Sequence, residues 1–127
     1  MKVSVKSSQN RQVVDITDDI QSALPKGHNG LATATVLHTT AAITTAEASP
    51  DTNADLLAFL GKLTPEGVKW QHSPGSEHAS DHFLAALIGP SVTLPVEAGR
   101  LSLGTWQRVV LIELDGPKSR QVFVSLN

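Results

Sequence analysis

The residues best suited to bind a transition metal in this sequence are histidines, because the chain has no cysteine. His78 and His82 are four residues apart in a predicted helix, so their rings share one face and can reach one ion. His72 lies in the loop just before that helix, and His38 ends a predicted strand. Neutral imidazoles suit zinc, and three protein nitrogens plus water make an open catalytic site. The same spacing also occurs as an ordinary surface feature, and spacing alone leaves both interpretations open.

Three carboxylates follow the strand that ends at His38. Glu47, Asp51 and Asp55 could act there as a general base, as partners of metal-bound histidines, or as magnesium ligands. Asp51 is also explained as a helix cap, and Asp55 as a solvent-facing residue. Glu47 has no such simple explanation, because it follows a run of small residues. We therefore rank Glu47 above the other two.

A second group of interest is the segment Gly-Thr-Trp-Gln at residues 104–107, which lies between two predicted strands. Glycine permits close approach of the backbone, and the indole and amide side chains can hold a flat polar ligand. A core tryptophan beside a structural glycine explains the segment equally well. Arg100, Arg108 and Arg120 can bind phosphate, although pairing with surface carboxylates is commoner. The sequence has no glycine-rich phosphate loop and no nucleophile elbow.

Length and composition limit the classes of protein to consider. A chain of 127 residues is the size of one domain with a modest core. A net charge of −2, with scattered lysines and arginines, argues against nucleic acid as the main partner. The chain lacks the run of roughly 20 apolar residues that spans a bilayer, and its start lacks the apolar core of a signal peptide. We therefore expect no membrane association and a cytoplasmic location.

Periodicity and turn residues predict the elements that must position these groups. A short helix is expected after residues 17–19, a second from residues 49–51 through about Lys62, and a third over residues 77–88. Residues 64–75 are predicted to be a loop, and residues 115–117 a turn. Strands are predicted at residues 3–5 and 13–16, paired as an opening hairpin, and at 31–37, 41–45, 92–96, 99–103, 109–114 and 121–126. Without regular βαβ alternation, this order indicates one α+β domain over residues 1–127 with a mainly antiparallel sheet.

Taken in order, the polar motifs resemble those of one known family, and the likeness covers nearly the whole chain. The Gly-Thr-Trp-Gln segment after Gly-Arg-Leu is its most specific part. The sequence resembles the YjbQ-like family, catalogued as UPF0047 and later called secondary thiamine-phosphate synthase. The matching residues are His38-Thr39-Thr40-Ala41-Ala42, Glu47, Pro50, Asp55, His72, His82, Gly89, Pro95, Gly99-Arg100-Leu101, Gly104-Thr105-Trp106-Gln107, Asp115-Gly116-Pro117 and Arg120.

The resemblance implies an α+β fold with a β-sandwich-like core and two to three helices, assembled as a homotrimer. It places the shared polar residues in a pocket at subunit boundaries. His38, His72 and His82 are the implied ligands of a divalent metal, zinc or magnesium. His78, where relatives tend to carry Asn or Asp, is a further candidate ligand. Departures at His78 and at Ala46, where many relatives carry Asn, leave the ligand set open.

These residues together suggest a metal-assisted enzyme that acts on a small phosphorylated or heteroaromatic substrate. The activity reported for the family joins a pyrimidine diphosphate to a thiazole phosphate and is regarded as a side activity. The alternative is a non-catalytic oligomeric module that binds a small metabolite or a metal. A structural protein that uses histidines only for assembly is a third interpretation. The expected catalytic residues are Glu47, Asp55 and His38, and the expected substrate-binding residues are Thr39, Thr40, Thr105, Trp106, Gln107 and Arg120.

Overall fold

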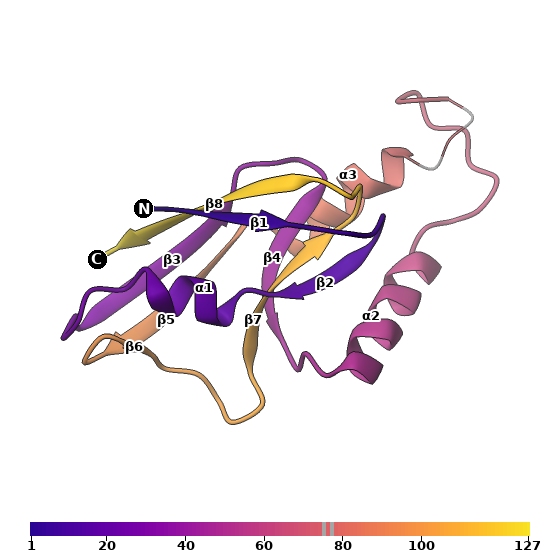
Figure 1. Cartoon of the computed structure of the whole chain (residues 1–127). Helices are drawn as coiled ribbons and strands as arrows, with labels where there is room; N and C mark the ends of the chain where they lie inside the picture. Colours follow the sequence, from indigo (N-terminus) through magenta and orange to yellow (C-terminus); the bar gives the residue numbers. More distant parts are fainter. Residues whose placement is uncertain (75, 77) are drawn as a thin grey trace.

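The computed structural model describes residues 1–74, 76 and 78–127. Two antiparallel sheets and a layer of helices make up the fold (Figure 1). The strands are β1 (Lys2–Lys6), β2 (Gln12–Asp15), β3 (Gly30–Val36), β4 (Ala41–Ala46), β5 (Ser91–Glu97), β6 (Arg100–Leu101), β7 (Arg108–Glu113) and β8 (Ser119–Leu126). The helices are α1 (Thr17–Ser22), α2 (Pro50–Lys62) and α3 (His78–Ile88). No helix among the described residues is both long and apolar enough to cross a membrane.

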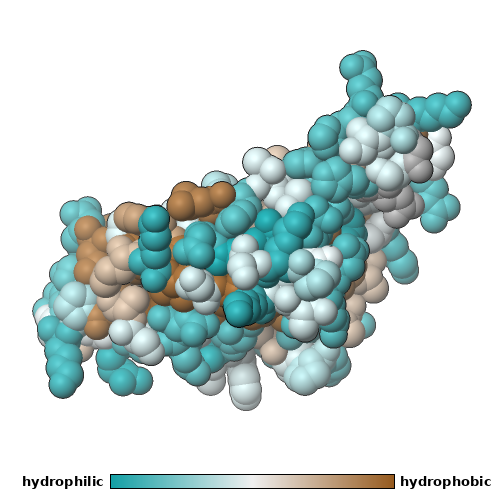
Figure 2. All heavy atoms as spheres, turned by 45° about the horizontal axis from the view of Figure 1, so that its top comes forward, coloured by the Kyte–Doolittle hydropathy of each residue, from teal (hydrophilic) through white to brown (hydrophobic). Residues whose placement is uncertain are grey.

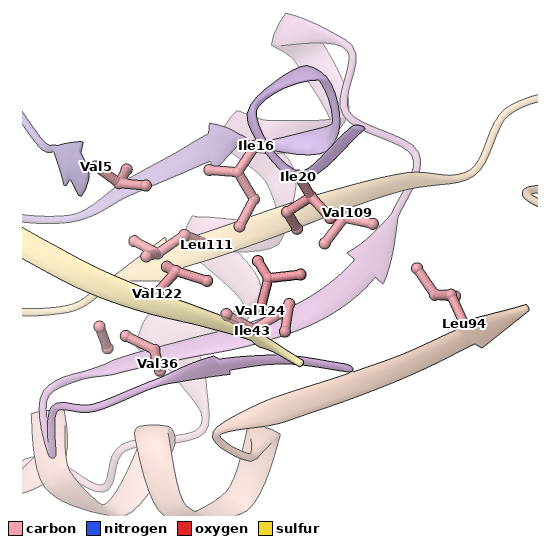
Figure 3. Close-up of a cluster of buried hydrophobic side chains, with 12 residues drawn as sticks. Val5, Ile16, Ile20, Val36, Ile43, Leu94, Val109, Leu111, Val122 and Val124 are labelled. Atoms are coloured by element: carbon pink, nitrogen blue, oxygen red, sulfur yellow. The ribbon is translucent and has the colours of Figure 1, made fainter. Parts of the chain in front are cut away.

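The two sheets pack face to face around the main core. One sheet has the strand order β1-β8-β3-β5-β6 and the other has the order β2-β7-β4. Alternate residues of β7 point to opposite faces, so Val109 and Leu111 enter the core between the sheets (Figure 3). Val110 and Ile112 face the other way, toward a second apolar cluster. Because both faces of β7 are covered, this strand is an uninterrupted apolar run rather than an alternating one.

The second apolar cluster joins the three-stranded sheet to α2 and α3. Leu60 from α2 and Leu84 and Ala85 from α3 pack there against Ala42 and Ile112. Helix α2 begins after Ser49 with a proline at its first position, where the missing N–H costs nothing. The molecule therefore has three layers, which are the larger sheet, the smaller sheet and the helices α2 and α3, while α1 contributes Ile20 to the core between the sheets. The α+β class and the antiparallel, sandwich-like arrangement expected from the sequence are confirmed.

The predicted opening hairpin is wrong. Strand β1 pairs with β8 in one sheet, whereas β2 pairs with β7 in the other. The polar segment between them crosses from sheet to sheet, and Ser7 is buried at the crossing, where its hydroxyl donates to Glu113 at 2.7 Å. A polar segment that looks like a turn is thus a crossover between sheets, in which Ser7 is buried and residues 8–10 are exposed.

Element boundaries differ from the predictions by a few residues. The strand expected at residues 99–103 is only Arg100–Leu101, and β5 extends one residue beyond the expected 92–96 at each end. The helix expected to begin at Glu77 is described from His78, because Glu77 lies outside the described residues. Gly75, the last residue of the predicted loop, also lies outside them.

The register between β4 and β7 defines two ends of the smaller sheet. Ala41 pairs with Glu113 at one end, and Ala46 pairs with Arg108 at the other. The six residues of β4 separate these ends by roughly 17 Å at the usual rise of a strand. Helix α3 and the start of β4 lie at the upper end in Figure 1, and the β6–β7 connection lies at the lower end.

Candidate functional site

Three histidine rings converge at the first turn of α3. Each of His72, His78 and His82 offers a ring nitrogen, and these three atoms lie within 4.8 Å of one another. The Nε2 atoms of His78 and His82 are 3.2 Å apart. Two ligands of a tetrahedral zinc ion are about 3.3 Å apart when each zinc–nitrogen bond has its ordinary length. The separation of the two helical histidines therefore matches one edge of such a site.

Helix geometry and one aromatic contact bring the three rings together. His78 and His82 are one turn apart on α3, so they lie above one another on the same face. His72 comes from the α2–α3 loop, two residues after Trp70. The Trp70 ring packs edge-on against Phe83 of α3, with ring centroids 4.9 Å apart. This contact holds the loop against the helix and places the His72 ring 4.7 Å from that of His82.

The other nitrogen of His78 faces two carboxylates. Its Nδ1 is 3.3 Å from Oδ2 of Asp81 and 3.6 Å from Oδ2 of Asp115. Arg11 donates to Asp81 at 2.9 Å, and Lys118 donates to Asp115 at 2.6 Å. The hydrogen bond from Lys118 lowers the pKa of Asp115 below its ordinary value, although partial burial opposes this. Each carboxylate thus has its own cation beside it.

A cavity of about 330 Å³ lies next to the histidine cluster. Ala85 and Ala86 follow His82 by three and four residues, so all three line it from one face of α3. The other lining residues are His38, Thr39, Ala41 and Pro90. Its volume is at the lower end of the range for small-molecule sites, and its walls are mostly small apolar groups with two imidazoles. The site is therefore suited to a small, partly apolar ligand.

His38 lines the cavity but is not among the converging nitrogens of the described residues. Its Nε2 accepts a hydrogen bond from the backbone N–H of Gln121 at 2.9 Å. Partial burial and the positive charge of Arg120 lower the pKa of His38 below its ordinary value, although the charge of Glu113 opposes them. A neutral ring that accepts at Nε2 carries its proton on Nδ1, so His38 offers a hydrogen-bond donor.

Arg120 lies beneath this end of the cavity in a buried ion pair. Arg120 and Glu113 are 2% and 0% exposed, and the guanidinium donates through both Nε and Nη2 to the carboxylate. Burial raises the pKa of Glu113, but hydrogen bonds from Arg120 and Ser7 lower it by more, so it stays ionised. Arg120 Nη2 also donates to Oγ1 of Thr40 at 2.9 Å and to its carbonyl oxygen at 3.1 Å. The ion pair of Arg120 with Glu113 therefore stabilises the segment that carries His38 and Thr39, because Arg120 also binds Thr40, the next residue.

The remaining predicted residues lie at the opposite end of β4. Gln107 donates to Thr45 at 3.2 Å and accepts from the N–H of Gly104 at 3.0 Å, which closes the β6–β7 loop. Trp106 in this loop is 77% exposed, and Thr105 is also exposed. Glu47 follows the end of β4 and accepts hydrogen bonds from Ser49 and Thr52, which lower its pKa. Asp55 is exposed on α2. Within one chain the described structure does not bring these residues to the histidines.

A comparison with known families identifies the chain. The sequence model described as UPF0047 protein YjbQ-like matches residues 1–127. The chain belongs to this family. A UPF0047 protein from Archaeoglobus fulgidus is 37% identical over 124 residues, and the match covers 98% of each chain. YjbQ from Salmonella typhimurium is 37% identical over 78% of this chain and 72% of that protein.

Solved structures of similar proteins have the same fold. A hypothetical protein from Aeropyrum pernix K1 matches with a TM-score of 0.92 and 39% identity, over 100% of this chain and 96% of that one. A protein of the yjbq/upf0047 family from Clostridium acetobutylicum matches with a TM-score of 0.89 and 36% identity, over 100% and 99%. Family membership therefore accounts for the fold, and the chemistry of the site has to be argued from its geometry.

Sequence reasoning missed several residues of this YjbQ-like site. Asp81 was not singled out, although it is three residues from His78 on the same helix and so was within reach of the spacing argument. Asp115 was predicted as a turn residue and matched the family motif, but no role at the site was assigned to it, because its approach to His78 depends on the tertiary fold. Ala85 and Ala86 contribute space rather than a functional group, and a sequence pattern does not mark such a role.

The burial of the Glu113–Arg120 pair leads to a stability prediction. Arg120→Ala should lower the free energy of unfolding by about 3–5 kcal/mol, because the Glu113 carboxylate stays buried without its cation. Arg108→Ala is the matched control, since Arg108 pairs with Asp15 at a side-chain exposure of 40%, and it should cost about 1 kcal/mol or less. Urea titration of both variants measures the difference. An equal loss of unfolding free energy in the two variants would contradict the conclusion that the buried pair contributes more to stability than the exposed one.

The environment of His38 leads to a prediction about pH. Its NMR titration should give a pKa below the ordinary value of about 6.5, with the proton of the neutral ring on Nδ1. Because the unfolded chain then binds this proton more tightly, the neutral ring stabilises the fold above about pH 6.5. That stability is lost as the pH falls from there through the folded-state pKa. A titration midpoint of His38 at or above about 6.5, or a neutral ring with its proton on Nε2, would contradict this prediction.

Proposed function

We propose that this protein is a metal-assisted enzyme whose ion is held by His72, His78 and His82. The observation that carries this proposal is the convergence of three ring nitrogens, two of them 3.2 Å apart, beside a cavity that shares His82. Imidazole ligands favour zinc over magnesium, which prefers oxygen. Three protein ligands leave the fourth position of a tetrahedral ion open toward a ligand. Bound there, the ion polarises a phosphoryl oxygen or activates water.

The cavity supports a small phosphorylated or heteroaromatic substrate. A heterocyclic ring fits against Ala41, Ala85 and Ala86, because their side chains leave an apolar space of about 330 Å³. His38 then acts as a hydrogen-bond donor to a substrate oxygen rather than as a metal ligand, because its Nε2 is occupied by the Gln121 N–H. The exposed hydroxyl of Thr39 provides a second polar contact at the rim.

The reaction we propose to test first joins a pyrimidine diphosphate to a thiazole phosphate. A bond forms between the two ring systems as the carbon–oxygen bond to the diphosphate breaks, and the diphosphate leaves with the electron pair. An ion held by His72, His78 and His82 would offset the charge on this leaving group. An ionised carboxylate offsets the positive charge that develops on the pyrimidine side. Glu47 is suited to that second role, since hydrogen bonds from Thr52 and Ser49 favour its charged form.

Glu47 and the 104–107 loop can serve this site only if they come from another subunit. They lie roughly 17 Å along β4 from the histidine end. We propose a homotrimer in which the Glu47 end of one subunit meets the histidine end of the next, a head-to-tail contact that closes into a ring. Exposed apolar side chains support such contacts, since Leu37 is 57% and Trp106 77% exposed. Figure 2 shows hydrophobic residues gathered over one half of the face that it presents.

The metal centre is tested by elemental analysis after dialysis against zinc. We expect one zinc per chain in the wild type and loss of most of it in His72→Ala and in His82→Ala, because each variant removes one of three ligands. His28→Ala is the control, because His28 is not among the described residues whose ligand atoms converge on a possible ion. Unchanged zinc content in both ligand variants would remove these residues as ligands.

The reaction is tested by pyrophosphate release from the pyrimidine and thiazole precursors. Glu47→Gln should slow release by roughly 10²–10³-fold, because it removes charge stabilisation while keeping the shape of the side chain. Asp19→Asn, an exposed change in α1, is the control and should have the wild-type rate. Tight binding of either precursor without turnover would instead favour a non-catalytic binding module.

A mixing experiment tests whether two subunits share the site. His82→Ala and Glu47→Gln proteins, each expected to have little activity alone, are unfolded together and refolded in equal amounts. A shared site should regain roughly a quarter of the wild-type rate, because each half of the site is intact in half of the subunits. A site contained in one chain regains nothing, and that result would contradict the proposed assembly.

A further inference from the structure

The His78 ring lies between two different environments. Its Nε2 faces His82 at 3.2 Å, on the side of the proposed ion. Its Nδ1, at the other side of the ring, faces Asp81 at 3.3 Å and Asp115 at 3.6 Å. The side chain of Asp81 is 11% exposed, and those of Asp115 and His78 are 25% and 34% exposed. The ring therefore meets nitrogen at one edge and carboxylate oxygen at the other.

We infer that Asp81 and Asp115 are positioning residues, which keep the His78 proton on Nδ1 and direct the Nε2 lone pair at the metal. This inference rests on the proposed metal centre. A neutral imidazole carries one proton, and an acceptor at Nδ1 draws it there and leaves Nε2 free as a ligand. Metal-bound histidines usually have such a partner, which orients the ring and raises its basicity as a ligand.

The two carboxylates come from separate parts of the chain. Asp81 is three residues after His78 on α3, so the helix alone brings it close. Asp115 lies beyond the end of β7 and reaches the ring only through the tertiary fold. Asp81, at 3.3 Å, is within hydrogen-bond distance of Nδ1, and Asp115, at 3.6 Å, acts on the ring through its charge, so carboxylates from two elements favour a proton at this nitrogen.

His78, Asp81 and Asp115 could also be the ligands of a second cation, since their ligand atoms lie within 4.8 Å of one another. The neighbouring cations argue against this. Arg11 is 2.9 Å from Asp81, and Lys118 is 2.6 Å from Asp115, so the charge of each carboxylate is already balanced. A second ion would have to displace these ammonium and guanidinium groups. Accepting a hydrogen bond from Nδ1 requires no displacement.

The protonation of the ring is measured on metal-free protein with ¹⁵N-labelled histidine. Long-range proton–nitrogen NMR correlations should show the His78 proton on Nδ1 in the wild type. They should show a shift toward Nε2 in Asp81→Asn and in the Asp81→Asn, Asp115→Asn double variant, because an amide is a weaker acceptor than a carboxylate. A change in packing alone does not predict this redistribution. A wild-type proton on Nε2 would overturn the inference.

Zinc affinity is then measured by competition with a chelator. Asp81→Asn should weaken zinc binding roughly 10–100-fold, and Asp115→Asn should weaken it less, because its oxygen is farther from Nδ1. Arg11→Gln is the matched control. It removes the same Arg11–Asp81 ion pair as Asp81→Asn but leaves the carboxylate beside His78, so it should keep the wild-type affinity.

The outcomes separate this inference from the proposed function. Wild-type affinity in both aspartate variants would overturn the inference and leave the metal centre standing. Equal weakening in Asp81→Asn and Arg11→Gln would also overturn it, since loss of the ion pair would then be the cause. A second zinc per chain that is lost in Asp115→Asn would show that the carboxylates are ligands, against the inference. A wild type that binds no zinc would overturn both.

Discussion

The buried ion pair between Glu113 and Arg120 is the interaction on which the rest of the site depends. Glu113 ends β7 in the smaller sheet, and Arg120 lies in β8 of the larger one. The pair therefore joins the two sheets at the end where the cavity opens. Ser7 and Thr40 complete its hydrogen bonds, which brings the β1–β2 crossover and the start of β4 to the same point. Two buried charges are tolerated there because each has several partners.

This arrangement explains why polar residues near Glu113 have defined positions although few of them belong to regular structure. His38, between β3 and β4, is held by the backbone of Gln121, the residue after Arg120. Asp115 follows Glu113 by two residues, and its N–H donates back to that carboxylate at 3.1 Å. The Glu113–Arg120 pair thus helps to position both His38, which lines the cavity, and Asp115, which faces His78.

Much of the fold could be predicted from the sequence, because local signals were strong where elements are regular. The apolar run of β7 and the Ser-Pro start of α2 identify their elements directly. Pairing was harder to predict, since the polar segment before β2 is compatible with a hairpin and with a crossover. The crossover depends on contacts such as that of Ser7 with Glu113, which joins residues 106 positions apart. Long-range partners of this kind leave no local pattern.

The site was predictable to a similar extent. Helical spacing brought His78 and His82 together, and the same argument extends to Asp81. Spacing could not show that the polar residues divide between the two ends of β4. Glu47 and Gln107 belong to the same family motifs as His38 and Thr39, yet the length of strand β4 separates the first pair of residues from the second. Resemblance to a family transfers a set of residues without their grouping, and the grouping is what limits the chemistry of one chain.

The alanines on α3 have a consequence for selectivity. Alanine keeps the helix at full propensity, whereas glycine would open the same space and weaken it. Ala85 and Ala86 therefore make the cavity wall from a rigid element. Ala86 is exposed, so a longer side chain at that position would narrow the cavity, whereas Ala85 is packed in the second apolar cluster and a longer side chain there would disturb the core. Under the proposed function, the size of the ligand and the binding of the ion therefore depend on different residues, so that a lineage of such proteins could change which ligand it accepts without changing its imidazoles.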